Sequence, residues 1–467
     1  MNIRLTAAGA ALAACTTICA GNNPASLATD SISHNDSIHR ESSLGEVAVV
    51  ARRAGTTRMG GAVNGFNLNR EELFRAACCN LGESFTTNPA VDVSYNDATT
   101  GARQIKLLGL AGTYVQMMTE NMPNFRGAAS PYALGYVPGP WMKGIQVSKG
   151  AASVKNGYEA ITGQINVDYK KPEDEEGIEV NLFGDTKSRI EANADANLHI
   201  NKQLSTEVLM HYENSFENHD DNDDGFYDKP KVEQYNLQNR WLWAGEKYIF
   251  HGGIGALKEH RNGGQTGHRG NDGAELFRIG LDTERYEAYM KHAFIIDRHK
   301  GTNIALMASG SMHMLDAGYG HKTYDVNEKN VYASLVFETN FTKMHNLSAG
   351  LSLNHDYLGQ TVRMVNDKEA SPVRMNEKET VPGIYAQYTF NLDHRLTAMA
   401  GIRADHSSVY GTFVTPRLHL KYMPNDILTL RLSAGKGYRT PHALAENNYL
   451  LASGRRLVID DLEQEEA

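Results

Sequence analysis

The sequence predicts a mainly β fold, a transmembrane antiparallel β-barrel that follows a smaller α+β domain. From Gly177 onward, apolar and polar residues alternate with a period of two in about thirteen segments, the last of which ends near Arg439. The segments are roughly ten residues long, the length that a tilted strand needs to cross a membrane. In 203–214, for example, one face carries Leu204, Thr206, Val208, Met210 and Tyr212.

The connections between these segments distinguish a membrane barrel from a soluble β-sandwich, whose strands would also alternate. Short polar turns, such as 201–202 and 424–426, join some segments. Long polar loops join others, as at 215–232, 259–274 and 359–380. Short turns on one side and long loops on the other are typical of an outer-membrane barrel. A sandwich has no reason to sort its loops in this way.

Composition narrows the class of protein further. The 467 residues carry a net charge of -9, which disfavours a nucleic-acid partner because such surfaces need clustered Lys and Arg. Mean hydropathy is -0.45. No run of 18 or more apolar residues follows the N-terminus, so ordinary transmembrane helices are excluded, whereas barrel strands are not.

The N-terminus, residues 1–20, resembles an export signal. Arg4 gives it a positive start, 5–14 is apolar, and small residues precede a cleavage position near Ala20. The alternative is a lipid-anchored Cys15, because residues 12–15 resemble a lipobox. Either route takes the protein out of the cytoplasm.

Two cysteines, Cys78 and Cys79, remain in the mature chain, too few for a disulfide framework. Adjacent thiols could bind a soft metal such as Cu(I). We favour the alternative that they lie on a short helix, 71–79, that packs into the domain, because free cysteine is usually a small buried apolar residue.

The chain before the barrel divides into a tether, 21–65, and a compact mixed domain, 66–172. The tether contains a short β-prone run near 44–51, which is suited to adding a strand to a partner's sheet or to starting the next domain. Lys170, Lys171 and Pro172, followed by acidic residues, mark the boundary to a partial barrel at 173–467.

The mixed domain resembles the plug of TonB-dependent receptors, and the likeness extends from residue 44 to about 450. Its motifs are Ile105–Gly109, Tyr114–Pro123, Ile145–Ala151 and Gly157–Val167. The resemblance places a TonB box at Glu46, Val47, Ala48, Val49 and Val50. It implies a plug inside the barrel lumen, since the family closes its barrel with about 22 strands around a plugged lumen. The acidic end, 463–467, cannot be a lipid-facing closing strand, so we expect a truncated barrel.

The resemblance also implies a function. Energised uptake of a scarce ligand (a metal complex, haem or cobalamin) would occur in the outer membrane of a Gram-negative bacterium, with the TonB protein and outer-membrane lipid as partners. Two departures, Glu120-Asn121 for Asp-Gly and Lys149-Gly150-Ala151 for Arg-Gly-Pro, suggest a subgroup distinct from the familiar iron-siderophore receptors. The alternative is a passive outer-membrane barrel or a surface adhesin without energy coupling.

The ligand-binding candidates lie near the expected plug apex: Met117, Met118, Glu120, Asn121, Met122 and Arg126. With Met312, His313, Met314 and His321 in the barrel they would suit copper or another soft metal. The alternative, favoured for the methionines, is that they fill the core.

The segment 220–228 matches the start of a calcium loop. Asp220, Asn222, Asp224 and Asp228 supply oxygen atoms in the required spacing and Gly225 allows the turn, but Lys231 stands where the loop needs Glu. A solvated acidic loop is the alternative. Beyond this calcium candidate no cofactor is required. No nucleophile–base pair or paired carboxylates are supported, so we expect transport and not an enzyme.

Overall fold

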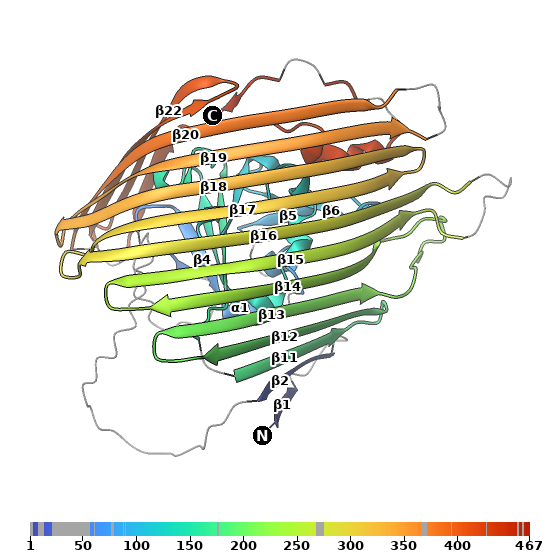
Figure 1. The fold of residues 1–467 in the computed structure, drawn as a ribbon, viewed down its shortest axis with the longest axis horizontal. Helices are drawn as coiled ribbons and strands as arrows, with labels where there is room; N and C mark the ends of the chain where they lie inside the picture. The colour runs from blue at the N-terminus through green and yellow to red at the C-terminus, as the bar shows by residue number, and fades with distance from the viewer. Residues whose placement is uncertain are drawn as a thin grey trace.

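The structure is a computed structural model. It describes residues 3–7, 14–20, 57–59, 61–75, 79–86, 88, 90–174, 177–267, 275–365, 371–393, 395–425, 427–454, 457–459 and 462–467. Figure 1 shows one large curved sheet of long strands that wraps around a smaller domain on its concave side.

The wall is a continuous antiparallel sheet in which each strand pairs with the next along the chain, from β11 to β23. Within the described residues these are thirteen strands, the number that the alternation predicts. Their bounds are β11 (Gly177–Gly184), β12 (Arg189–His199), β13 (Leu204–Ser215), β14 (Lys231–Ala244), β15 (Tyr248–Gly264), β16 (Arg278–Asp297), β17 (Thr302–Tyr319), β18 (Lys322–Thr342), β19 (His345–Met364), β20 (Val373–Leu392), β21 (Leu396–Ser407), β22 (Gly411–Tyr422) and β23 (Leu430–Gly435).

The two faces of the wall are inverted relative to a soluble protein. In β22, the buried side chains that face the inner domain are mostly polar, as for Thr415 and Arg417, whereas Val414 and Leu418 are exposed on the outside. Period-two alternation therefore places apolar side chains where lipid would lie and polar ones in the lumen. This arrangement confirms the predicted class of fold.

Most of the strands are longer than the roughly ten residues expected from membrane thickness, whereas β11 and β23 are shorter. Five neighbouring strands, β16 to β20, have 18 to 21 residues each. The loops 259–274 and 359–380 were predicted too long, because their outer residues belong to strands. Strand pairing continues through 259–264, 359–364 and 373–380. The connection 216–230 is long as predicted, and short turns lie at the opposite end. The predicted sorting is incomplete, because the connections 185–188, 320–321 and 408–410 at the end of the long loop are also short.

The inner domain is built on a sheet with strand order β3-β4-β9-β10-β7-β8, in which β10 and β7 are parallel. These strands are β3 (Thr57–Arg58), β4 (Gly65–Asn69), β7 (Val115–Thr119), β8 (Met122–Pro123), β9 (Met142–Lys149) and β10 (Gly163–Tyr169). A hairpin, β5 (Asp92–Asp97) with β6 (Ala102–Lys106), and two short helices, α1 (Arg70–Arg75) and α2 (Ala133–Tyr136), complete the domain. Its core joins plug side chains such as Val147 and Ile165 to wall side chains such as Leu281.

Several N-terminal predictions fall wholly or partly outside the described residues. The TonB box, 46–50, and Cys78 lie outside them. Cys79 is buried just beyond α1, which is shorter than the expected helix 71–79, and burial raises the pKa of its thiol. Residues 3–7 and 14–20 form strands β1 and β2 beside β11 (Figure 1), and the export signal stays a prediction. Within the described residues no helix is long and apolar enough to cross a membrane.

The C-terminal residues return to the concave side of the wall. After β24 (Tyr438–Arg439), the 3-10 helix η6 (Ala445–Ala452) lies against the inner domain, and β25 (Glu465–Glu466) pairs with β24. The buried amide oxygen of Asn448 accepts hydrogen bonds from the hydroxyls of Tyr132, at 2.8 Å, and Tyr319, at 3.2 Å. This segment therefore connects the inner domain to β17.

Candidate functional site

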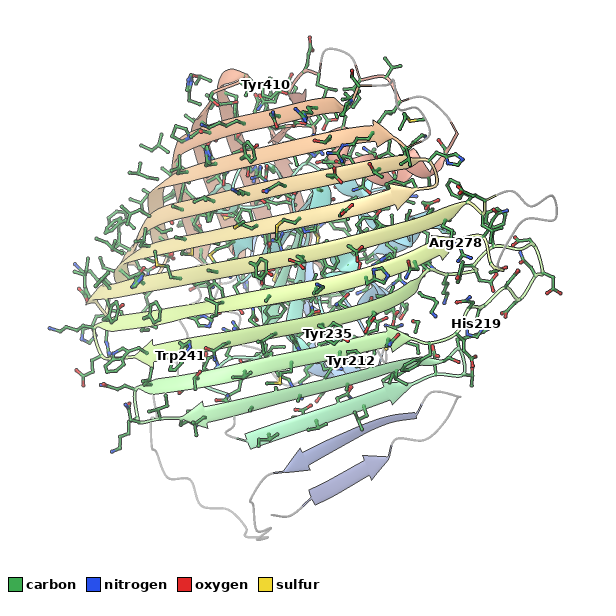
Figure 2. The ribbon with its side chains drawn as sticks, turned by 45° about the vertical axis from the view of Figure 1, so that its right-hand side comes forward. Tyr212, His219, Tyr235, Trp241, Arg278 and Tyr410 are labelled. Atoms are coloured by element: carbon green, nitrogen blue, oxygen red, sulfur yellow. The ribbon has the colours of Figure 1, made fainter. Side chains whose placement is uncertain are left out.

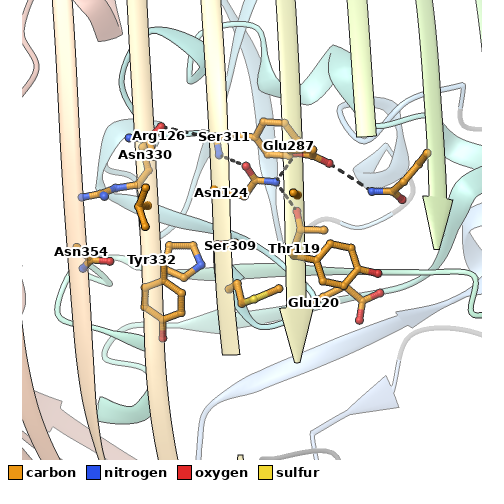
Figure 3. Close-up of a pocket in the computed structure, with 18 residues that line it drawn as sticks. Thr119, Glu120, Asn124, Arg126, Glu287, Ser309, Ser311, Asn330, Tyr332 and Asn354 are labelled. Carbon is orange, nitrogen blue, oxygen red and sulfur yellow. Dashed lines mark hydrogen bonds between the residues drawn. The ribbon is translucent and has the colours of Figure 1, made fainter. Parts of the chain in front are cut away.

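The candidate site is the turn that follows β7, residues 119–126, where the inner domain meets the wall. Figure 3 shows this turn facing wall residues such as Glu287, Ser309 and Asn330. The cavity between them has about 40 Å³ of room, enough for water but far too little for a haem or another large ligand. The turn and the wall therefore pack against each other here and leave no space for a large ligand.

The backbone of the turn is fixed by its own hydrogen bonds. Glu120 and Asn121 both have left-handed φ values, 53° and 61°. Asparagine tolerates this conformation, whereas glutamate needs surrounding contacts to hold it. The N–H of Glu120 donates to the carbonyl of Val167 at 3.0 Å, and that of Asn121 donates to the Asn166 amide oxygen at 2.7 Å. The tight turn thus aims the Glu120 side chain at the wall.

The Glu120 carboxylate is paired with cations of the wall. Arg240 Nη2 donates to Glu120 Oε1 at 2.5 Å, and Lys291 Nζ lies 3.4 Å from the other oxygen. Burial alone would raise the pKa of Glu120, but these two cations hold it well below its usual range. Arg240 itself is fully buried, and it also donates to the Lys170 carbonyl and to the Tyr289 hydroxyl. Five residues from plug and wall are joined in one network.

Arg126 makes a second connection of the same kind. Its Nη1 donates to both oxygens of Asp356, at 2.8 and 2.7 Å, and its Nη2 pairs with Glu159 of the plug. The next residue, Gly127, has a φ of 52°, and a Cβ there would lie 2.4 Å from the Glu328 carboxylate. Glycine suits position 127 because it adopts this φ without strain, and a side chain there would displace the Glu328 carboxylate.

Asn124 connects the turn to β16 within the cavity. Its amide oxygen accepts from Arg285 at 2.5 Å, and its amide nitrogen donates to Glu287 at 3.3 Å and to Thr119 at 3.2 Å (Figure 3). The cavity is thus polar but largely satisfied, which fits an interface that holds water.

A third contact lies at the 3-10 helix η5 (Val154–Asn156), which packs against β19 to β22. The Arg417 guanidinium donates to the carbonyls of Ala152, Ser153 and Tyr158, at 3.1 to 3.2 Å. Gly401 leaves room for Val154, since a Cβ built there would lie 2.6 Å from Val154 Cγ2. The plug therefore rests against the wall over several strands.

The methionines of the predicted site serve different purposes. Met118 and Met122 are buried, and Met122 packs with Met307 and Tyr332 in a small apolar cluster between plug and wall. Met117 is half-buried and packs against the main core. These contacts agree with methionine as a filler of the core.

The wider constellation of soft ligands is not assembled. Met312 and Met314 face away from the lumen, whereas His313 between them points inward and is fully buried beside the Tyr136 ring. Side chains alternate along a strand, so neighbouring residues cannot face one site. His321 lies in the exposed turn after β17.

The calcium candidates lie in the loop 216–230, and their oxygens are used within it. Asp220 accepts from the N–H groups of Asp224, at 3.0 Å, and Gly225, at 2.9 Å. Asp228 accepts from the N–H of Asp221, and the Asn222 amide donates to Asp224. Within the described residues no three His, Cys, Asp or Glu side chains are grouped so that they could hold a metal. The calcium site stays a prediction, which proteolysis of this loop with and without calcium would check.

The wall partners Arg240, Lys291, Asp356 and Arg417 are the functional residues that sequence reasoning missed. Each stands on the polar face of an alternating segment, and that was the only available signal. Alternation identifies a lumen-facing side chain, but it does not tell which plug residue lies opposite.

Residues 211–466, more than half of the chain, match one family model. The description of that family is "TonB dependent receptor-like, beta-barrel". A search of curated proteins gives no match.

Solved structures share the fold. The siderophore receptor PirA from Acinetobacter baumannii has a TM-score of 0.64 at 17% identity, over 81% of this chain and 61% of that one. The alcaligin outer membrane receptor FauA from Bordetella pertussis has 0.65 at 13%, over 82% and 64%. A ferric enterobactin receptor (PfeA) mutant from Pseudomonas aeruginosa has 0.62 at 14%, over 81% and 62%. The chain thus spans about three fifths of the length of these proteins.

Proposed function

Because this chain belongs to the TonB-dependent receptors, we propose that it takes up a scarce metal complex across the outer membrane with energy delivered through TonB. The observation that carries the proposal is the closed contact between plug and wall. Two buried charge networks, at Glu120 and at Arg126, join the two parts, and the space between them admits only water. A ligand passes such a contact only if the plug moves.

Moving the plug requires work. Removing one partner of a buried ion pair costs about 3 to 5 kcal/mol because the other charge stays behind without a counterion. Separating Glu120 from Arg240, and Arg126 from Asp356, would cost several times thermal energy unless water enters at the same time. The outer membrane has no ATP supply of its own, so the proposal assigns the source of work to TonB, which pairs with Glu46–Val50.

We propose an iron–siderophore complex as the first ligand to test, with haem and cobalamin next. The similar solved structures are receptors for siderophores, which supports this order. The sequence departures at Glu120-Asn121 and at Lys149-Gly150-Ala151 favour a subgroup with its own ligand. The ligand therefore has to be identified by a panel.

The experiment compares uptake of radiolabelled compounds by cells that make the unaltered protein or a version without residues 46–50. The panel contains iron complexes of catecholate and hydroxamate siderophores, haem and cyanocobalamin. We expect accumulation of one class, and its loss on deletion while binding at the cell surface persists. Equal uptake by both versions, at equal abundance in the outer membrane, would favour a passive barrel. Surface attachment without any uptake would favour an adhesin.

A further inference from the structure

The end of the wall that carries the short turns also carries a band of positive charge. Six connections lie at this end, and one of them, 423–429 between β22 and β23, carries no lysine or arginine. The other five join β12 to β13, β14 to β15, β16 to β17, β18 to β19, and β20 to β21, and each of these five has at least one exposed lysine or arginine among its described residues. We call these side chains the basic rim: Lys202, Lys247, Arg298, Lys300, Lys343 and Arg395.

Few carboxylates lie beside this band. Among the described residues of these turns and the strand ends that flank them, the carboxylates are those of Glu246, Asp297 and Asp393, half as many as the cations. Asp297 is committed to its own turn, since it accepts from the N–H groups of His299, at 2.9 Å, and Lys300, at 3.2 Å. The rim therefore keeps an excess of positive charge.

The opposite end of the wall has the reverse balance. The loop 216–230 carries six acidic residues against one lysine, Lys229. Figure 2 shows His219 and Arg278 at this loop end, and Trp241 toward the other. The excess of cations is thus confined to the short-turn end.

Large apolar side chains accompany each cation of the rim on the outer face. Ile200 precedes Lys202, and the four other turns repeat the pattern within a few residues. The exposed side chains are Trp243 before Lys247, Ile296 before Arg298, Phe341 before Lys343 and Leu392 before Arg395. Trp241, Phe294 and Tyr388 extend this band along neighbouring strands. Aromatic residues at strand ends mark the level of lipid headgroups.

We propose that the basic rim binds the headgroups of phospholipids with a net negative charge in the membrane leaflet at the short-turn end. Lysine and arginine keep their apolar stems along the wall while their charges reach the phosphates. Each cation held near an anionic surface strengthens binding, and the effect fades within a Debye length. The repeat of one apolar anchor and one cation in five separate turns carries this inference.

The proposal rests on the proposed function, because that function places the wall in a membrane. The competing occupant of the rim is an acidic protein in the periplasm. A bound protein would have no use for exposed apolar side chains on the lipid-facing side of every turn. The band of apolar side chains beside the rim therefore favours lipid.

The test measures which phospholipids gather around the protein after purification from outer membranes into phosphatidylcholine vesicles. Spin-labelled phosphatidylglycerol and spin-labelled phosphatidylcholine are the probes, and electron paramagnetic resonance gives their relative association. One variant, K247Q/K300Q/K343Q, removes three cations of the rim. A matched control, K229Q/R278Q/R374Q, removes three exposed cations at the loop end.

At low salt we expect the unmodified protein and the control to prefer phosphatidylglycerol, and the rim variant to lose this preference by about fivefold or more. Salt at roughly 1 M, where the Debye length is about 3 Å, should abolish the preference of the unmodified protein, a readout that needs no variant. Equal loss in both triple variants, or no preference at low salt, would overturn the inference. A rim variant that keeps the normal lipid preference but takes up less ligand would also overturn the inference, because this result would indicate a protein partner. Absence of the unmodified protein from the outer membrane would instead contradict the proposed function.

Discussion

At the scale of single residues, Glu120 and Arg240 form a fully buried ion pair between plug and wall. Neither side chain reaches solvent to any extent, and Arg240 has no second carboxylate closer than Glu207, at 3.8 Å. Loss of the Glu120 charge leaves the buried guanidinium with only this more distant carboxylate. The pair therefore stabilises the closed state by more than a surface ion pair would.

We expect E120Q to loosen the plug by about 3 kcal/mol, the cost of a buried charge without its partner. Limited proteolysis of 114–126 in the purified protein measures the effect. The control is K258Q, which breaks the exposed pair Lys258–Glu284 of 3.0 Å and should cost no more than about 1 kcal/mol. Equal cleavage of the two variants would show that the Glu120 pair does not hold the plug.

The same carboxylate gives a pH dependence of known sign. The folded pKa of Glu120 is depressed, so its contribution is present above the unfolded value of about 4.5 and is lost as pH falls below it. Resistance to proteolysis should therefore fall in acid for the unmodified protein and change less for E120Q.

At the scale of elements, the segment after β24 is held by a buried histidine. The Nδ1 of His442 lies 2.7 Å from the carboxylate of Glu377, near the start of β20. Burial disfavours the charged imidazole, but Glu377 and Glu446 together raise the pKa of His442 to about 9. Protonated His442 therefore ties η6 to the wall.

The pKa of His442 is higher in the folded protein than the value of 6.5 in the unfolded chain. Protonated His442 therefore stabilises the folded protein fully below pH 6.5, and this stabilisation is lost as the pH rises through about 9. Its upper limit is about 3 kcal/mol. We expect hydrogen exchange of 445–452 to accelerate between pH 7 and 10 once the intrinsic rate is corrected. H442Q should already exchange fast at pH 7 and show little further change. A similar rise with pH in H442Q would assign the effect to other groups.

The elements were largely predictable because alternation is a local property. Burial of one face forces every second residue of a strand to be apolar, so thirteen strands could be counted from the sequence. The ends of these strands could not be predicted from the sequence. In 259–264 and 373–380 the strands continue with polar residues on both faces, as beyond the membrane, and such residues look like loops.

The candidate site was only half predictable for a related reason. Glu120, Asn121 and Arg126 could be chosen because they stand in a plug motif. Their partners Arg240 and Asp356 depend on which strand of the wall lies beside the turn, and this is set by the packing of the whole domain. The soft-metal set, for which core-filling methionines were the favoured alternative, is not assembled, since the register of β17 turns Met312 and Met314 outward.

At the scale of the whole molecule, the plug and the wall are joined by several separate contacts. The Glu120 network reaches β14 and β16, the Arg126 network reaches β19, and η5 with Arg417 lies against β19 to β22. Uptake in this account requires that these contacts separate when TonB pulls. A plug that cannot leave the wall should bind ligand and fail to transport it.

A disulfide that fixes the plug to the wall, V154C/G401C, tests whether transport requires the plug to move. A Cβ at 401 lies 3.4 Å from that of Val154, close to the separation of about 3.5 to 4.5 Å that a disulfide needs. The measurement is uptake of the radiolabelled ligand by oxidised and reduced cells, with V154C alone as control. We predict that oxidation stops uptake, that surface binding persists, and that a reductant restores transport. Uptake at the full rate with the disulfide formed would contradict the account.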